Sequence, residues 1–177
     1  GLEAGAIGSN FRLTVTANAG NGAKVGVASS ENVSANAVGR AFATDSGELK
    51  LTGGFAGTLS VTATAGVVNG GDDTSATATA HAFYAGVNTA GQLAIAGTIT
   101  GNITVKAVAN NFSQVGDAAL AIGFAASGAI SLGEFGSAFR LTVNAASIGN
   151  AAGRAIRSGD TLAIERLDGS WTVSAKG

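Results

Sequence analysis

One short pattern recurs five times along the sequence: an aliphatic or aromatic residue, Thr or Ser, Val, a variable residue and Ala. The copies are Leu13-Thr-Val-Thr-Ala17, Leu59-Ser-Val-Thr-Ala63, Ile103-Thr-Val-Lys-Ala107, Leu141-Thr-Val-Asn-Ala145 and Trp171-Thr-Val-Ser-Ala175. The first and fourth copies belong to a longer identical word, Phe-Arg-Leu-Thr-Val, which starts at Phe11 and at Phe139. A unit this thin cannot bury its own apolar face, so its copies must stack on one another.

Each copy is part of a longer unit. A short segment precedes it, namely Leu2-Glu-Ala, Leu49-Lys-Leu51, Leu93-Ala-Ile95, Ile130-Ser-Leu132 and Leu162-Ala-Ile164. Between segment and copy lie one apolar residue (Ile7, Phe55, Ile99, Phe135, Leu167) and one glycine (Gly8, Gly57, Gly101, Gly136, Gly169). The first four copies are followed by a loop and an Ala-rich third segment, marked by Ala41-Phe42, Ala82-Phe83, Gly123-Phe124 and Ala155-Ile156. One unit therefore reads as strand, turn, strand, loop, strand, turn.

The repeat predicts an all-β fold, a parallel β-solenoid of about five coils and specifically a right-handed three-sided β-helix, with a β-sandwich as the alternative. Residues 1–177 then form a single repeat domain. Alternation within the pattern turns its first and third residues inward and the polar residues outward. The inner ladder consists of Val15, Val61, Val105, Val143 and Val173, and beside it lie Leu13, Leu59, Ile103, Leu141 and Trp171. These valines are 46, 44, 38 and 30 residues apart, and most of the difference falls in the loop after the pattern.

Composition agrees with stacked strands and excludes several classes of partner. The absence of proline suits strands that must donate every N–H to a neighbour. Without cysteine there are no disulfides, thiolate metal sites or thiol nucleophiles. The net charge of −1 predicts no nucleic-acid partner, and the most apolar stretch, 118–130, is too short to insert into a membrane as a helix. We expect no cofactor and no metal.

The two ends of the predicted solenoid carry no covering helix or proline-rich plug. Unpaired terminal strands are templates for further pairing. The sequence therefore predicts either a segment of a longer solenoid or a filament subunit whose copies associate end to end.

Individual polar and aromatic residues give weak candidates for a site. His81 occupies an alternating outward position and is expected to be an ordinary surface histidine, because a base or metal ligand needs partners. Gly70-Gly-Asp-Asp-Thr74 could bind a cation, although Gly and Asp are normal turn residues. Tyr84 is the best candidate for an exposed aromatic that could contact a glycan. The acidic residues are scattered, which argues against the carboxylate cluster of a polysaccharide-cleaving β-helix.

Three further surface features have both a structural and a functional interpretation. The outward ladder Thr14, Ser60, Thr104, Thr142 and Thr172, with Thr16, Thr62, Lys106, Asn144 and Ser174 beside it, is similar to the Thr arrays of ice-binding solenoids, but hydroxyl ladders also stabilise sheets. A late charged cluster is either a solvated edge or a docking surface: Arg154, Arg157, Asp160, Glu165, Arg166, Asp168 and Lys176. Asn32, Asn102 and Asn111 begin glycosylation sequons, which arise often by chance in such a composition.

The five copies of the Thr/Ser-Val-x-Ala pattern, the glycine-rich corners and the low charge resemble the β-helical shafts of large secreted bacterial surface proteins, of the filamentous haemagglutinin and autotransporter passenger kind. The resemblance implies a non-enzymatic structural or adhesive role outside the cell or on its surface, with end-to-end self-association and a surface glycan as a further partner. A glycan- or ice-binding module and a polysaccharide-degrading enzyme are the alternatives. The uneven unit length departs from those shafts.

Overall fold

The structure is a computed structural model that describes residues 1–21, 34–67, 75–86, 90–111 and 117–177. Its regular elements are all strands, and they form three parallel sheets. In the order in which the strands pair, the first sheet contains β1 (Leu2–Ala4), β4 (Glu48–Leu51), β7 (Gln92–Ile95), β10 (Ile130–Glu134) and β13 (Leu162–Arg166). The second contains β2 (Arg12–Asn21), β5 (Thr58–Val67), β8 (Asn102–Asn111), β11 (Arg140–Ser147) and β14 (Ser170–Lys176). The third contains β3 (Ser34–Thr44), β6 (Ser75–Ala85), β9 (Ala118–Ala126) and β12 (Asn150–Ser158).

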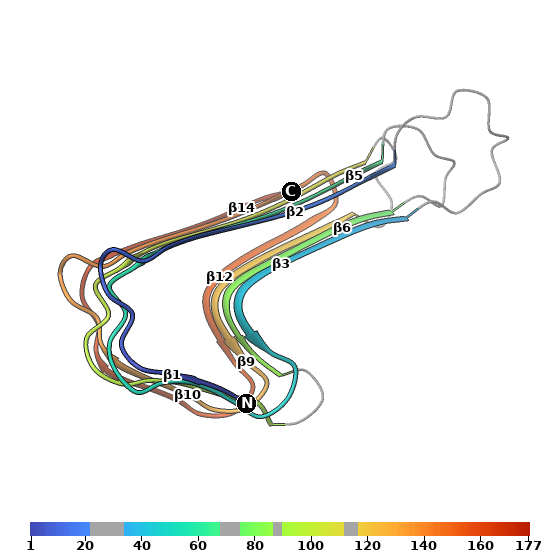
Figure 1. Cartoon of the computed structure of the whole chain (residues 1–177). Coiled ribbons are helices and arrows are strands. Elements are labelled where there is room, and N and C mark those ends of the chain that lie inside the picture. Colours follow the sequence, from blue (N-terminus) through green and yellow to red (C-terminus); the bar gives the residue numbers. More distant parts are fainter. Residues whose placement is uncertain (22–33, 68–74, 87–89, 112–116) are drawn as a thin grey trace, which may run out of the picture.

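Successive strands of one coil therefore belong to three different sheets, and each strand pairs with its equivalents in the coils before and after it. This arrangement confirms the predicted parallel β-solenoid of about five coils, the fifth of which consists of β13 and β14. Figure 1 looks along the stack. The second and third sheets run beside each other as a long arm, and the third sheet then bends sharply toward the first. We call this bend the elbow, and its outer side is concave.

Register across the stack follows the sequence repeat. The structure pairs Val15 with Val61, Val61 with Val105, Val105 with Val143 and Val143 with Val173. The neighbouring ladder runs through Leu13, Leu59, Ile103, Leu141 and Trp171 in the same way. The segments before each copy also align, from Leu2 through Leu49, Leu93 and Ile130 to Leu162. Each coil thus adds one layer to a shared core.

Aromatic rings fill the core where the three sheets meet. Phe42, Phe83 and Phe124 stack on one another with ring centroids 5.2 Å apart at each step. Phe55 and Phe135 meet this stack edge-on, from the turns that join the first sheet to the second. These offset and edge-to-face geometries are the favourable ones for aromatic rings.

The apolar turn residues of the first four coils form a column that does not continue into the fifth coil. Isolated parallel bridges join Ile7 to Phe55, Phe55 to Ile99 and Ile99 to Phe135. Leu167 is the corresponding apolar residue of the fifth unit, but it is 61% exposed. Trp171 packs against Phe135 instead, with ring centroids 4.7 Å apart. The two rings meet in a T-shaped arrangement, so the fifth coil contacts the aromatic core through Trp171.

Coil length varies most in the connections from the second sheet to the third. The connections from the second to the third sheet comprise residues 22–33, 68–74, 112–117 and 148–149 in successive coils. The strands on either side keep their register across all four coils. Among the described residues, no helix has the length and apolarity needed to span a membrane.

Candidate functional site

The repeated word Phe-Arg-Leu-Thr-Val builds a turn. Arg12 donates from Nη1 to the backbone oxygens of Ser9 and Phe11. Arg140 makes the equivalent bonds to Ser137 at 2.7 Å and to Phe139 at 2.8 Å. Each arginine therefore ties down the turn that precedes its own strand. The word is a duplicated piece of architecture, and its arginines are occupied by backbone carbonyls.

The outward hydroxyl ladder exists as an aligned row on the second sheet. Thr14, Ser60, Thr104, Thr142 and Thr172 are paired in register, and each side chain is exposed or half-buried. In the adjacent row, Lys106 lies between Thr62 and Asn144. Asn144 also accepts a 2.6 Å hydrogen bond from the Ser174 hydroxyl. The face is polar and ordered, and it is interrupted by one ammonium group.

The other predicted surface candidates are not brought together. Gly70–Thr74 lies outside the described residues, as do Asn32 and the end of the Asn111 sequon, whereas Asn102 is exposed at the start of β8. Within the described ranges, no group of three or more His, Asp or Glu side chains could hold a metal. Of the late charged cluster, Arg166 forms an exposed ion pair with Glu134 at 3.6 Å. An exposed pair of this kind contributes little to stability.

The ends of the solenoid expose residues that the middle coils bury. In the first sheet, Leu2 and Leu162 are 41% and 49% exposed, while the equivalent side chains between them are buried. In the second sheet, Val173 is 43% exposed, although Val61, Val105 and Val143 are fully buried. The remaining exposed large apolar side chains of the described chain, Val38, Ile148 and Leu167, lie on or beside the outermost strands. Both ends therefore present apolar columns and unpaired strand edges.

Two sequence predictions are wrong at the elbow. His81 was expected to be a surface side chain but is only 4% exposed, and Tyr84 was expected to be an exposed aromatic but is only 9% exposed. The reason lies between them, where Ala82 and Phe83 are both fully buried. The residues at the position of Ala82 are absent from the pairing of the third sheet, so strict alternation fails at that point. His81 and Tyr84 consequently face each other across the concave side, with ring centroids 4.8 Å apart.

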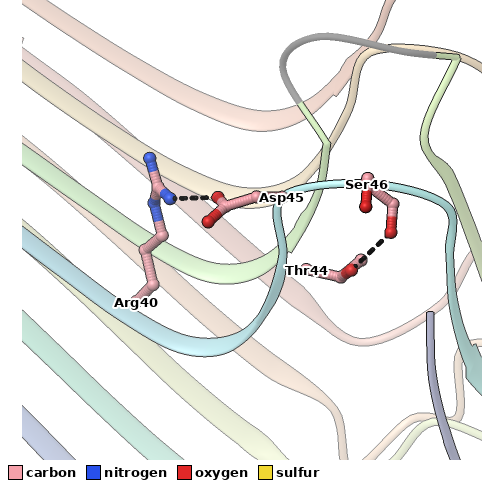
Figure 2. Close-up of polar contacts among 4 residues, drawn as sticks. All are labelled: Arg40, Thr44, Asp45 and Ser46. Carbon is pink, nitrogen blue, oxygen red and sulfur yellow. Dashed lines mark hydrogen bonds and ion pairs between the residues drawn. The ribbon is translucent and has the colours of Figure 1, made fainter.

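Arginines flank these two rings. Arg40 on β3 is paired with His81, and its Cζ lies 4.1 Å from the centroid of the Tyr84 ring, a cation–π contact. Figure 2 shows its Nη1 reaching Asp45, beyond the end of the strand, at 3.0 Å. On the far side, Arg157 of β12 pairs with Ala125, which in turn pairs with Tyr84. Ile122, Tyr84 and Ala125 form a small apolar cluster of their own, separate from the main core.

Burial, together with the smaller effect of the positive charges of Arg40 and Arg157, lowers the pKa of His81 to about 4. The imidazole is therefore neutral at pH 7. Its Nδ1 atom is buried and has no hydrogen-bond partner among the residues that the structure describes. A buried polar atom without a partner is uncommon in folded proteins and marks a place where a ligand or a solvent molecule can bind.

A pocket of about 260 Å³ opens beside the histidine, on the concave side of the elbow. Three successive strands and the turns after them supply its lining, which consists of His81, Tyr84, Gly86, Ala125, Ala126, Ser127, Arg157 and Gly159. Apolar surface, one neutral imidazole, one phenol and one guanidinium are thus gathered in a single hollow. The elbow pocket thus brings polar side chains from three strands of the third sheet to one cavity.

Sequence reasoning missed this pocket although a signal was present. Each of the first four units contains two adjacent residues that both face the core, such as Ala82-Phe83 and Gly123-Phe124. Such a pair is incompatible with an unbroken alternating strand and indicates a bend. Placing the bend there would have put His81 and Tyr84 on the same concave side.

No family model, curated protein or solved structure matches the chain.

Proposed function

We propose that the protein is a non-enzymatic structural and adhesive solenoid, part of a bacterial surface protein or fibre outside the cell, in which stacking continues from end to end. The observation that carries this proposal is the exposure of the core columns at both ends. Leu2 and Leu162 occupy the same column at opposite ends of the stack, and both remain about half exposed. A further coil or a second copy would bury them.

The two ends of the solenoid have strand edges that can pair with each other. The outermost strands β1 and β2 at one end, and β13 and β14 at the other, each have one free edge among the described strands. A second copy placed head to tail would continue the parallel pairing, with Leu162 of one copy next to Leu2 of the other. Contacts of this kind do not close on themselves and generate filaments.

The protein combines strands in constant register with connections of variable length, an arrangement that suits the display of loops as well as a structural role. Register is kept in all three sheets, while the connections between the second and third sheets change in length from coil to coil. The strand ends that these connections join lie together at one end of the arm (Figure 1). A shaft that holds different loops along one side is suited to adhesion. The extracellular bacterial setting is proposed from the resemblance in composition and pattern.

Electron microscopy and light scattering over a range of protein concentrations test the association. We expect particles that lengthen along one axis as the concentration rises. Leu162→Lys puts a charge into the end column and should shift the association to higher concentration by about tenfold or more. Thr172→Lys is the matched control, because it adds the same charge at an exposed outward position on β14, the next strand along the chain. A wild-type chain that stays monomeric at all concentrations, or equal effects of the two variants, would refute end-to-end stacking.

Binding to ice or to a glycan is a second candidate function, and the aligned hydroxyl row of the second sheet favours it. Paired strands repeat every ~4.8 Å, so the row presents hydroxyls at a regular spacing. Thermal hysteresis and a glycan array test the two ligands. If ice binding uses this row, Thr142→Lys at its fourth position should abolish the hysteresis, whereas Lys50→Ala on the first sheet should leave it unchanged.

A further inference from the structure

The elbow pocket contains a cation that the fold leaves unpaired. Arg40 is engaged by Asp45 and by the Tyr84 ring, and Arg12 and Arg140 are engaged by carbonyl groups. Arg157 lines the pocket and has neither an ion pair nor a hydrogen bond within the described residues. Asp45 pairs with Arg40, whereas no acidic side chain of the described residues pairs with Arg157, although the chain as a whole has a net charge of −1.

A second observation points to a ligand at the same place. The His81 side chain, 4% exposed, lines the pocket, and its Nδ1 atom has no partner. No hydrogen bond at Nδ1 fixes the tautomer of the neutral ring, so the ring can present an N–H to a bound group. Charge-assisted and neutral donors that converge on one hollow are the usual means of holding an oxygen anion.

We propose that the elbow pocket binds a small oxyanion, a carboxylate or phosphate carried on a single ring or short chain, with Arg157 as its cationic contact and His81 as a neutral hydrogen-bonding contact. The volume of about 260 Å³ is larger than one carboxylate or phosphate group needs and somewhat below the range of drug-sized ligands. Ala125 and Ala126 supply apolar surface for the part of the ligand that carries the anion. This proposal goes beyond a structural role and does not depend on end-to-end stacking.

Two natural reporters make the test direct, because the chain contains a single histidine and a single tyrosine and both line the pocket. Their ring protons can be followed by proton NMR while the full chain is titrated with glucuronate, inorganic phosphate or glucose at pH 7. We expect saturable shifts of both rings with at least one of the two anions, below about 20 mM, and none with glucose.

The matched variants are Arg157→Ala, which removes the pocket cation, and Arg166→Ala, which removes an exposed guanidinium on the first sheet. Arg157→Ala should weaken binding by about tenfold or more, and Arg166→Ala should leave it within about twofold, provided that circular dichroism shows both variants to be folded. Saturation by glucuronate alone identifies a carboxylate ligand, and saturation by phosphate alone identifies a phosphate ligand. No saturation by either anion, equal binding of glucose, or equal loss in the two variants would overturn the proposal.

Discussion

The guanidinium of Arg40 lies over the ring of Tyr84, with its Cζ 4.1 Å from the ring centroid, although the two residues belong to successive coils. The same guanidinium spans the bend of its own strand to reach Asp45 at 3.0 Å (Figure 2). One side chain therefore connects two coils and holds the elbow of the first. It also places a positive charge beside His81, which lies next to it in the ladder.

We predict that removing either flanking arginine raises the pKa of His81. In the wild type this pKa is about 4, because burial is the largest cause of the shift and Arg40 and Arg157 add to it. Arg40→Ala and Arg157→Ala each remove one repulsive charge, so both should move the midpoint toward the ordinary value of about 6.5. The titration can be followed on the only histidine of the chain by proton NMR. Arg166→Ala is the control and should leave the midpoint unchanged.

We predict that the free energy of unfolding falls as the pH is lowered through the range between the unfolded and the folded pKa of His81. The unfolded chain binds a proton on this histidine below about pH 6.5, whereas the folded chain binds it only below about pH 4. The free energy of unfolding therefore rises with pH across this interval, and lowering the pH from neutral through it should cost up to about 3 kcal/mol. His81→Phe keeps an aromatic ring against Tyr84 but cannot titrate.

Urea unfolding at several pH values compares the wild type with His81→Phe. Taking the difference in unfolding free energy between the two chains cancels the contribution of the carboxylates, because these titrate in both chains. We expect the variant to be the more stable chain near pH 4 and its advantage to shrink toward pH 7. A constant difference over the whole range would contradict a depressed pKa at this site.

The ladders could be predicted from sequence because their period matches the fold. Leu-Thr-Val-Thr alternates strictly, and each copy lies at the same place in its coil, so Val15 and Val61 had to share a column in any parallel stack. Differences in coil length did not disturb this result, since they fall mainly in the connections between strands, above all in those from the second sheet to the third. A periodic pattern in which every unit agrees is the easiest feature to read from a sequence.

The elbow could not be predicted by the same rule, because the backbone departs from alternation there. His81 and Tyr84 are three positions apart, so strict alternation puts them on opposite faces, yet the structure puts their rings 4.8 Å apart on one side. Arg157 reaches the same pocket from a coil that lies two units later in the sequence. The bend is signalled only by the adjacent core-facing pair Ala82-Phe83, and the meeting of Arg157 with His81 and Tyr84 is not encoded in the spacing of single residues.

The Val ladder offers a graded test of how burial contributes to stability. Val105 is fully buried between neighbours on both sides, while Val173 at the end of the same ladder is 43% exposed. Val105→Ala should cost about 2 kcal/mol of unfolding free energy, and Val173→Ala should cost less than about 1 kcal/mol. Both values are measured by urea denaturation at a low protein concentration, where the chain is monomeric. Equal losses of unfolding free energy in the two variants would mean that the end coil is already shielded from solvent.

The glycine that follows each apolar turn residue gives a further comparison within the repeat. A Cβ added at Gly101 would lie 2.3 Å from the backbone oxygen of Gly57 and 2.5 Å from the ring of Phe55, whereas a Cβ at Gly8 would meet nothing within 4 Å. Since a backbone oxygen cannot move aside as a side chain can, Gly101→Ala must push two coils apart. We expect it to cost about 2–3 kcal/mol, and Gly8→Ala, the same change at a turn glycine of the first coil, to alter stability by less than about 0.5 kcal/mol. Thermal and urea unfolding of the two variants measure the difference, and an equally well tolerated Gly101→Ala would show that the coils are not packed as closely as the structure has them.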